Sequence, residues 1–483
     1  MSSRSTKIYL LIFLAIFTRF FALNWGGNFF FHPDENNMAS SLSQLSPGNL
    51  NPNFFAYGQF PLYLGYFFLR LLGLPNTFAN SIFILRFFSA TFSLISLFFF
   101  YKIYPRLSFL FLLIFTPGLI QLAHFGTTES LLILTFSINL YLAKLILKKP
   151  SLKLFIFASI TTAIAIATKI SGLFFALPII LAAIFTSSFL LIIPYILTFP
   201  IFSLLLSPYN LLAWPDFLST INYETAVATG SIPVFYTTQF LHSFPYLFQL
   251  IKVFPYANSW PILFFAFMSI FFIKKIKDKK FVIILFITSF AYFLYFGQTY
   301  VKWTRFMSPL FFITPLLAST ILRHRPKLLL LSIIPAVFFF ANYFATDTRI
   351  QASNYLIRNI PSGSTILSES GNVVNLPVYP NNFNTINYDF YNYRPRDLAV
   401  ILYQSDYILI PSRRVFKNYN YQYYSHLFDG RLGFVEIKKI TPYFDLFLDP
   451  ENAEETWSVF DRPTIRLYKK VTNLSIEQYE NLL

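Results

Sequence analysis

The sequence predicts a polytopic α-helical membrane protein of about eleven spans, followed by a small C-terminal α/β domain. Hydrophobic residues make up 55% of the 483 residues and charged residues only 12%. Apolar runs long enough to cross a bilayer recur to about residue 345. Beyond that point, short apolar stretches alternate with turn residues, which is typical of a folded α/β domain.

The runs that we expect to cross the membrane lie at 8–24, 82–101, 107–122, 130–147, 152–168, 172–187, 188–206, 259–273, 281–297, 306–322 and 328–345. No small-residue cleavage site follows the first run, so we expect an uncleaved helix and not a signal peptide. The stretch 60–74, with Pro61 near its start, is expected to lie in the interface. If it crossed the bilayer, every later basic cluster would change sides.

The basic residues indicate which ends of the spans face the cytoplasm. The net charge of +16 arises largely from clusters in short loops, so it indicates topology and not a nucleic-acid partner. With the N-terminus inside, the later clusters fall on the same side: Lys102/Arg106, Lys148/Lys149/Lys153, Lys274/Lys275/Lys277/Lys279/Lys280 and Arg323/Arg325/Lys327. The loops 25–81 and 207–258 and the tail then lie outside, at the plasma or inner membrane.

The absence of cysteine excludes disulfides, thiolate metal sites and a cysteine nucleophile.

The domain organisation follows from this pattern. Residues 1–345 are expected to form the membrane domain, and residues 346–483 an extracytoplasmic α/β domain. Its first turn is expected at Pro361-Ser362-Gly363-Ser364, ahead of short apolar runs such as Tyr407-Ile-Leu-Ile.

Adjacent carboxylates, Asp34 and Glu35, emerge where the first outer loop begins a helix. Near an apolar boundary a carboxylate can accept a proton from a hydroxyl nucleophile. The structural alternative is a helix start, because Pro33 at the first position followed by acids favours the helix dipole. Glu129 has the same two interpretations, since Thr127 or Thr128 could cap the helix that it opens.

Three cations on the outer side depart from the positive-inside trend. Lys169 interrupts two apolar runs, where it either serves a site or extends to the interface. Lys302 and Arg305 lie together on a short outer loop, which favours an anionic partner such as a lipid phosphate. A structural ion pair is the alternative.

Taken together, these residues resemble the GT-C membrane glycosyltransferases, specifically the relatives of protein O-mannosyltransferase and of the lipid A aminoarabinose transferase. The resemblance covers essentially the whole chain. It rests on Phe31-His32-Pro33-Asp34-Glu35, Tyr57-Gly58-Gln59-Phe60-Pro61-Leu62-Tyr63, Ile84-Leu85-Arg86-Phe87-Phe88-Ser89-Ala90, His124-Phe-Gly-Thr-Thr-Glu129-Ser-Leu-Leu, Ala167-Thr-Lys169-Ile-Ser-Gly, Lys302-Trp-Thr-Arg305-Phe-Met-Ser-Pro309, Ile366-Leu-Ser-Glu369, Asn375-Leu-Pro377 and Ser405-Asp-Tyr407-Ile-Leu-Ile-Pro-Ser-Arg413-Arg414.

The resemblance implies transfer of a sugar from a polyprenyl-phosphate donor to an acceptor on the outer face, with inversion. Asp34 would be the general base, and Glu35 would help to hold the acceptor or a metal. The donor phosphate would be bound by Lys169, Lys302 and Arg305. Contacts to the acceptor or sugar are expected from Tyr57, Glu129 and Glu369. No cofactor is certain, and a divalent cation, held by Asp34, Glu35 and Glu129, is left open. Partners are the donor, membrane lipids and an unidentified protein, lipid or glycan acceptor.

Two other functions remain as alternatives. A polymerase or ligase of cell-surface polysaccharide would place its chemistry in the loop 207–258, where Asp216, Glu224 and His242 are available. These residues form no recognisable motif, and packing in the loop or contact with an acceptor is the favoured interpretation of Asp216 and Glu224. A transporter or flippase would use Asp34, Glu129 and Lys169 for coupling or gating. The position of the acids at the outer rim argues against that reading.

Overall fold

The computed structural model describes residues 3–232, 234–271, 278–370, 382–413, 421–442 and 448–483. The basic cluster at 274–280 and the tail motifs at 375–377 and 414 therefore lie wholly or partly outside the described residues. The chain forms two compact units. Unit 1 comprises 1–24, 34–232 and 244–340, and unit 2 comprises 25–33, 233–243 and 341–483.

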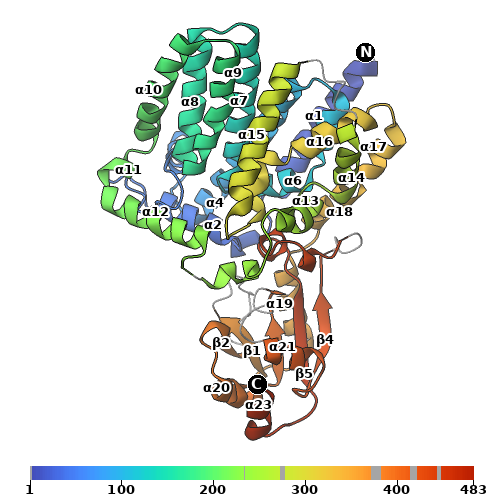
Figure 1. Cartoon of the computed structure of the whole chain (residues 1–483). Helices are drawn as coiled ribbons and strands as arrows, with labels where there is room; N and C mark the ends of the chain where they lie inside the picture. The colour runs from blue at the N-terminus through green and yellow to red at the C-terminus, as the bar shows by residue number, and fades with distance from the viewer. Residues whose placement is uncertain (1–2, 233, 272–277, 371–381, 414–420, 443–447) are drawn as a thin grey trace. The chain divides into compact units, whose positions relative to one another are not determined.

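Unit 1 is helical (Figure 1). Its principal elements are α1 (Ser3–Phe20), α2 (Pro33–Ser43), α3 (Phe60–Leu71), α4 (Phe78–Ile103), α5 (Leu107–Ile114), α6 (Pro117–His124), α7 (Glu129–Lys148), α8 (Leu152–Thr168), η2 (Ile170–Ala176), α9 (Leu177–Phe185), α10 (Phe189–Leu206), α11 (Tyr209–Leu212), α12 (Trp214–Thr229), η4 (Gln249–Val253), α13 (Phe254–Ala257), α14 (Trp260–Ser269), α15 (Lys279–Gln298), η6 (Thr304–Leu310), α16 (Ile313–Leu322), α17 (Pro326–Ser332) and α18 (Ile334–Ala341).

Among the described residues, five helices are long and apolar enough to cross a membrane, or up to eight if each bent helix pair is one span. The expected multi-pass helical protein is thus confirmed, whereas the count of eleven stays a prediction. Helix α3 has 12 residues, and at about 1.5 Å per residue it is too short for a bilayer core of about 30 Å. This length agrees with the interfacial position expected for it.

Two of the predicted runs, 107–122 and 306–322, are each divided by a bend, and a third bend lies at the start of the run 259–273. The pairs α5/α6 and η6/α16 bend by 54° and 50°, and the segment 249–257 meets α14 at 111°. Proline accounts for part of this pattern: Pro117 opens α6, and Pro309 lies inside η6. Ser259, just before α14, has a positive φ of 66°.

A buried arginine stabilises the first of these breaks. The Arg19 guanidinium donates to the carbonyls of Ile114 (2.5 Å) and Leu113 (3.2 Å), where α5 ends. The regular helical hydrogen bonds end at this bend, so the arginine supplies additional donors inside the protein, although Leu113 also accepts from the Thr116 N–H at 3.3 Å. Sequence periodicity gave no sign of this role.

Unit 2 is built on a five-stranded mixed sheet of order β2-β1-β3-β5-β4. Its strands are β1 (Thr365–Ser370), β2 (Asn384–Asp389), β3 (Tyr407–Ile410), β4 (Phe434–Ile440) and β5 (Ile465–Lys470). Strands β1, β2 and β3 run parallel, and β5 is antiparallel to both β3 and β4. Helices α19 (Thr348–Asn359), α20 (Pro395–Gln404), α21 (Tyr421–Phe428) and α23 (Ile476–Leu482) complete it (Figure 1).

Alternate residues of the strands enter two cores. Leu367 and Ile408 pack with residues of α20, α21 and α23, whereas Ile366 and Leu409 pack with residues of α19. The sheet is therefore covered on both faces, as the short, fully apolar Tyr407–Ile410 strand requires. This confirms the expected small α/β domain.

Unit 2 also takes in two segments that lie between helices of unit 1 in the sequence, 25–33 and 233–243. Arg349 lies over the ring of Phe31 at 3.7 Å, and the rings of His32 and Phe460 are 4.6 Å apart. Gln239 donates to Glu454 at 2.7 Å. These contacts explain why 25–33 and 233–243, expected within loops of the membrane domain, group with the tail.

Candidate active site

The two adjacent acids of α2 have different surroundings. The Glu35 carboxylate is fully buried and accepts from Arg86, with Nε to Oε1 at 3.0 Å and Nη2 to Oε2 at 2.6 Å. The backbone N–H of Gly126 donates a further bond of 2.6 Å. Such a paired, hydrogen-bonded carboxylate is held rigidly. Glu35 therefore fixes the start of α2 against α4 and the turn before α7.

Asp34 is ion-paired with Arg305, which belongs to η6. Each of these side chains is 19% exposed, so the pair lies at the edge of the protein interior. The Arg305 guanidinium also stacks on Trp303, 4.7 Å from the ring centre. Its Nε is buried and has no hydrogen-bond partner among the described residues. A guanidinium with an unused donor can still bind an anion.

A second ion pair lies in the same cluster. Lys169, at the break between α8 and η2, places its ammonium 3.7 Å from Glu129 at the start of α7. The ammonium also lies over the rings of Tyr57 (5.1 Å) and Phe306 (5.2 Å). Phe306 follows Arg305 directly, so the two cations are brought to one region of unit 1.

The loop that carries Tyr57 requires glycine at the next position. The N–H of Gly58 donates to the carbonyl of Thr168 at 2.9 Å. A Cβ at position 58 would lie 1.9 Å from the Ala167 carbonyl oxygen. The glycine thus permits the close backbone approach that sets Tyr57 against Lys169. Burial raises the pKa of the Tyr57 hydroxyl well above its usual value, so the residue stays neutral.

Glu224, on α12, joins the same cluster. It is in electrostatic range of Arg305, Lys169 and Asp34. From sequence, Glu224 was expected to pack in its loop or contact an acceptor, or to serve the rival polymerase function, because no motif surrounds it. A long-range contact places it here: the Val301 N–H donates to the Ala228 carbonyl at 3.3 Å, which joins α12 to the turn before Arg305.

Two other residues predicted for the site, Lys302 and Glu369, form other contacts. The Lys302 ammonium donates to the Tyr300 carbonyl at 2.9 Å, and burial lowers its pKa. Glu369 lies on β1 in unit 2, where the Tyr424 hydroxyl donates to it at 2.5 Å.

In the part of the chain that the structure describes, no three Asp, Glu or His side chains are grouped so that they could hold a metal ion.

An apolar pocket of about 280 Å³ lies beside the η6 segment in unit 1. Leu310, the last residue of η6, lines it together with Leu250, Phe254, Phe290 and Phe293. At about 2.0 Å per residue of 3₁₀-helix, Leu310 is roughly 10 Å along the axis from Arg305. An apolar chain could therefore occupy this pocket while its polar end meets Arg305.

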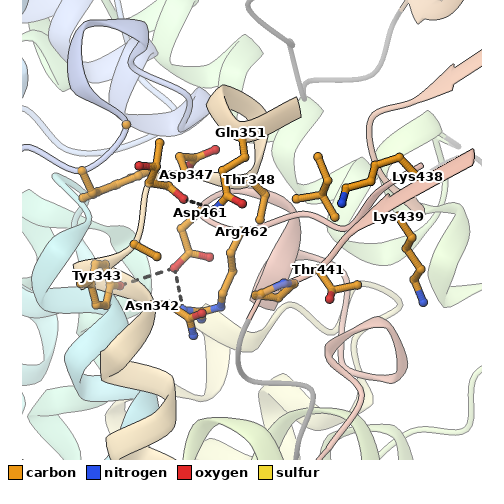
Figure 2. A pocket seen from close by; sticks show the side chains of 16 residues that line it. Asn342, Tyr343, Asp347, Thr348, Gln351, Lys438, Lys439, Thr441, Asp461 and Arg462 are labelled. Atoms are coloured by element: carbon orange, nitrogen blue, oxygen red, sulfur yellow. Dashed lines mark hydrogen bonds and ion pairs between the residues drawn. The ribbon is translucent and has the colours of Figure 1, made fainter. Parts of the chain in front are cut away.

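Unit 2 contains a polar pocket of about 290 Å³ of its own. Figure 2 shows Tyr343, Asp461 and Arg462 linked on one side and Lys438 on the other. The Tyr343 hydroxyl donates to Asp461 at 3.4 Å, and Arg462 is paired with the same carboxylate at 3.4 Å. The pocket offers donors and acceptors suited to a polar ligand.

The apolar helical unit and the sheet-containing tail together match a GT-C type membrane fold. The fold is similar to that in the crystal structure of ArnT from Cupriavidus metallidurans bound to undecaprenyl phosphate, with a TM-score of 0.51, 15% identity, and coverage of 74% of this chain and 73% of that chain. The apo state of ArnT from Cupriavidus metallidurans gives a TM-score of 0.46 and 18% identity over the same shares. No protein-family model and no curated protein sequence matches the chain.

The comparison confirms, at the level of fold, the resemblance to GT-C membrane glycosyltransferases stated from the motifs, since ArnT is an aminoarabinose transferase of that type. At 15% identity the likeness concerns the fold alone.

Proposed function

We propose that this chain is an integral-membrane glycosyltransferase that moves a sugar from a polyprenyl-phosphate donor to an acceptor hydroxyl on the outer face of the plasma or inner membrane. The acceptor is a protein, lipid or glycan, and the sugar is a hexose or pentose. The observation that carries this proposal is the pairing of Asp34 with Arg305 beside the pair of Lys169 with Glu129. The outer face follows from the distribution of the basic loops.

The two cations suit the donor phosphate. Arg305 can form two parallel hydrogen bonds to phosphate oxygens, and Lys169 adds a compact charge. The apolar pocket that Leu310 helps to line would accommodate isoprene units of the donor. The ArnT structure holds undecaprenyl phosphate, a lipid of the same chemical class. Lys302 lies three residues before Arg305 and would support phosphate binding from the same loop.

Donor binding would also release the base. In the structure, Arg305 is ion-paired with Asp34. When the phosphate draws the guanidinium away, Asp34 is left to accept the proton of the acceptor hydroxyl. The oxygen then attacks the anomeric carbon from the face opposite the phosphate, the bond from that carbon to the phosphate oxygen breaks, and the configuration inverts. Glu35 would keep α2 in place, and Tyr57 and Glu129 would contact the sugar or acceptor.

Substitution of Arg305 tests this clamp. We expect Arg305→Ala to weaken binding of undecaprenyl phosphate by about 10- to 100-fold, because charged hydrogen bonds contribute about 1.5–3 kcal/mol. Arg305→Lys should restore binding only in part, since the charge returns without the planar fork. Binding would be measured by titration of the full chain in nanodiscs, together with the melting temperature.

The matched control is Arg70→Ala, which removes an exposed arginine from α3 and should leave affinity unchanged. If Arg305→Ala lowers the melting temperature but binds the lipid as tightly as the unmodified chain, Arg305 has a structural role only. That result would remove the phosphate clamp from the proposal.

A further inference from the structure

The ionised groups of the candidate active site do not balance. Two cations, Lys169 and Arg305, each lie within electrostatic range of the same three carboxylates: Asp34, Glu129 and Glu224. With all five ionised, the cluster carries one excess negative charge. A polyprenyl-phosphate sugar is a phosphodiester and brings one more. In a site of low dielectric, like charges disfavour further ionisation. One carboxylate should therefore be neutral when the donor is bound.

The contacts single out which carboxylate that is. Asp34 is paired with Arg305 and Glu129 with Lys169. Within the described ranges, the Glu224 carboxylate has neither a hydrogen bond nor an ion pair. Burial raises its pKa, Asp34 raises it further, and the two cations lower it. Glu224 is thus the carboxylate that can be protonated without breaking an ion pair or hydrogen bond of the site.

The helix of Glu224 is fixed against the phosphate-binding turn. The bond from Val301 to Ala228 joins α12 to that turn. At the end of α12, Gly230 has a φ of 81°, and a Cβ there would lie 2.7 Å from the Tyr300 ring. The position of Glu224 is therefore set by packing on the segment that presents Arg305.

We propose that Glu224 takes up a proton when the donor binds and acts as the general acid for the departing phosphate, opposite in role to Asp34. This rests on the proposed glycosyl transfer. The acceptor O–H proton passes to Asp34 as the acceptor oxygen bonds to the anomeric carbon. The bond from that carbon to the phosphate oxygen breaks with its electron pair on oxygen, which receives the proton of Glu224. Polyprenyl phosphate leaves as a monoanion, and solvent removes the proton from Asp34.

The division of labour follows a general rule. Two carboxylates whose surroundings push their pKa values apart serve as base and acid in one site. Once Asp34 has lost its proton to solvent, ionised Glu224 restores the excess negative charge of the cluster and disfavours the anionic product, which assists its release. The next donor can bind once Glu224 is protonated again.

The first test is the pH dependence of donor affinity. The probe is the methyl ester of undecaprenyl phosphate, a phosphodiester whose single charge does not change near neutral pH, bound to the full chain in nanodiscs. We expect affinity for the unmodified chain to fall by about tenfold per pH unit above the pKa of Glu224, because one proton is linked to binding. Glu224→Gln keeps the neutral form, so its affinity should be independent of pH over the same range.

The groups that face Glu224 from neighbouring elements could also titrate. They are Asp34, Tyr57, Lys169 and Arg305. Asp216→Asn is the matched control, since it removes an exposed carboxylate from the first turn of α12 and should keep the pH dependence. A slope that persists in Glu224→Gln, or is absent from the unmodified chain, overturns the proposal. The measurement on the unmodified chain needs no variant, so a folding defect of Glu224→Gln could not obscure its result.

The second test separates this inference from the proposed function. Glu224→Gln should lower kcat by about 10²-fold, at the low end for acid catalysis because phosphate is already a good leaving group. If Asp34→Asn loses turnover while Glu224→Gln retains it, sugar transfer stands and Glu224 is not the acid. If the unmodified chain does not bind the phosphodiester probe, both the proposed function and the role of Glu224 as general acid are contradicted.

Discussion

Asp34→Asn is expected to lower kcat by about 10²-fold or more, within the 10²–10⁴-fold range of general-base catalysis. The amide keeps the size of the side chain and can still accept a hydrogen bond from Arg305, but it cannot take up the acceptor proton. Because Asp34 is partly exposed and not the buried member of the acid pair, the variant should fold. Single-turnover kinetics with saturating donor would measure the chemical step directly.

Donor affinity is the control measurement for Asp34→Asn, because it separates a loss of chemistry from a loss of binding. Donor affinity of Asp34→Asn should equal or exceed that of the unmodified chain, since Arg305 no longer has a carboxylate that competes with the phosphate. A loss that appeared only in KM would point to a role in binding. Turnover close to that of the unmodified chain would exclude Asp34 from proton abstraction.

Arg86→Ala is expected to destabilise the protein by about 3–5 kcal/mol, because it leaves the buried Glu35 charge without its partner. The backbone N–H of Gly126 would remain as a donor, which is insufficient to replace a guanidinium. The measurement is thermal melting of the full chain in detergent, with donor binding as a second readout.

A double variant isolates the charge effect. Glu35→Leu combined with Arg86→Met removes both charges and preserves most of the volume, so it should melt higher than Arg86→Ala alone. If Arg86→Ala melts like the unmodified chain, the ion pair is not what fixes the start of α2. The Glu35–Arg86 pair would then not be what positions Asp34.

The motif around Asp34 and Glu35 could be recognised from sequence, but the different surroundings of the two acids could not. The Arg305 partner of Asp34 lies 271 positions away, and the Arg86 partner of Glu35 lies 51 positions away. Pairings of that kind depend on tertiary packing. The sequence did indicate Lys169 and Arg305, because a cation on the outer side of an apolar chain has a large desolvation cost that a partner must offset.

Other features carried no local signal. Glu224 lies in a helix without a motif, and its place in the site depends on how that helix packs on the turn at Val301. Hydropathy located the apolar runs well, because it measures only composition. It missed the bends between α5 and α6 and between η6 and α16, since those depend on proline, on short 3₁₀ segments and on buried groups such as Arg19 that satisfy the freed carbonyls.

The most direct test of sugar transfer is to follow the donor itself. The purified full chain in nanodiscs would be incubated with a panel of polyprenyl-phosphate sugars and a membrane extract as the source of acceptor, and the lipids analysed by mass spectrometry. We expect at least one donor to be converted to free polyprenyl phosphate by the unmodified chain, with the sugar recovered on an acceptor, and Asp34→Asn to leave that donor intact. Equal conversion by both proteins, or binding of donors with none consumed, would contradict the proposal that this site transfers sugars.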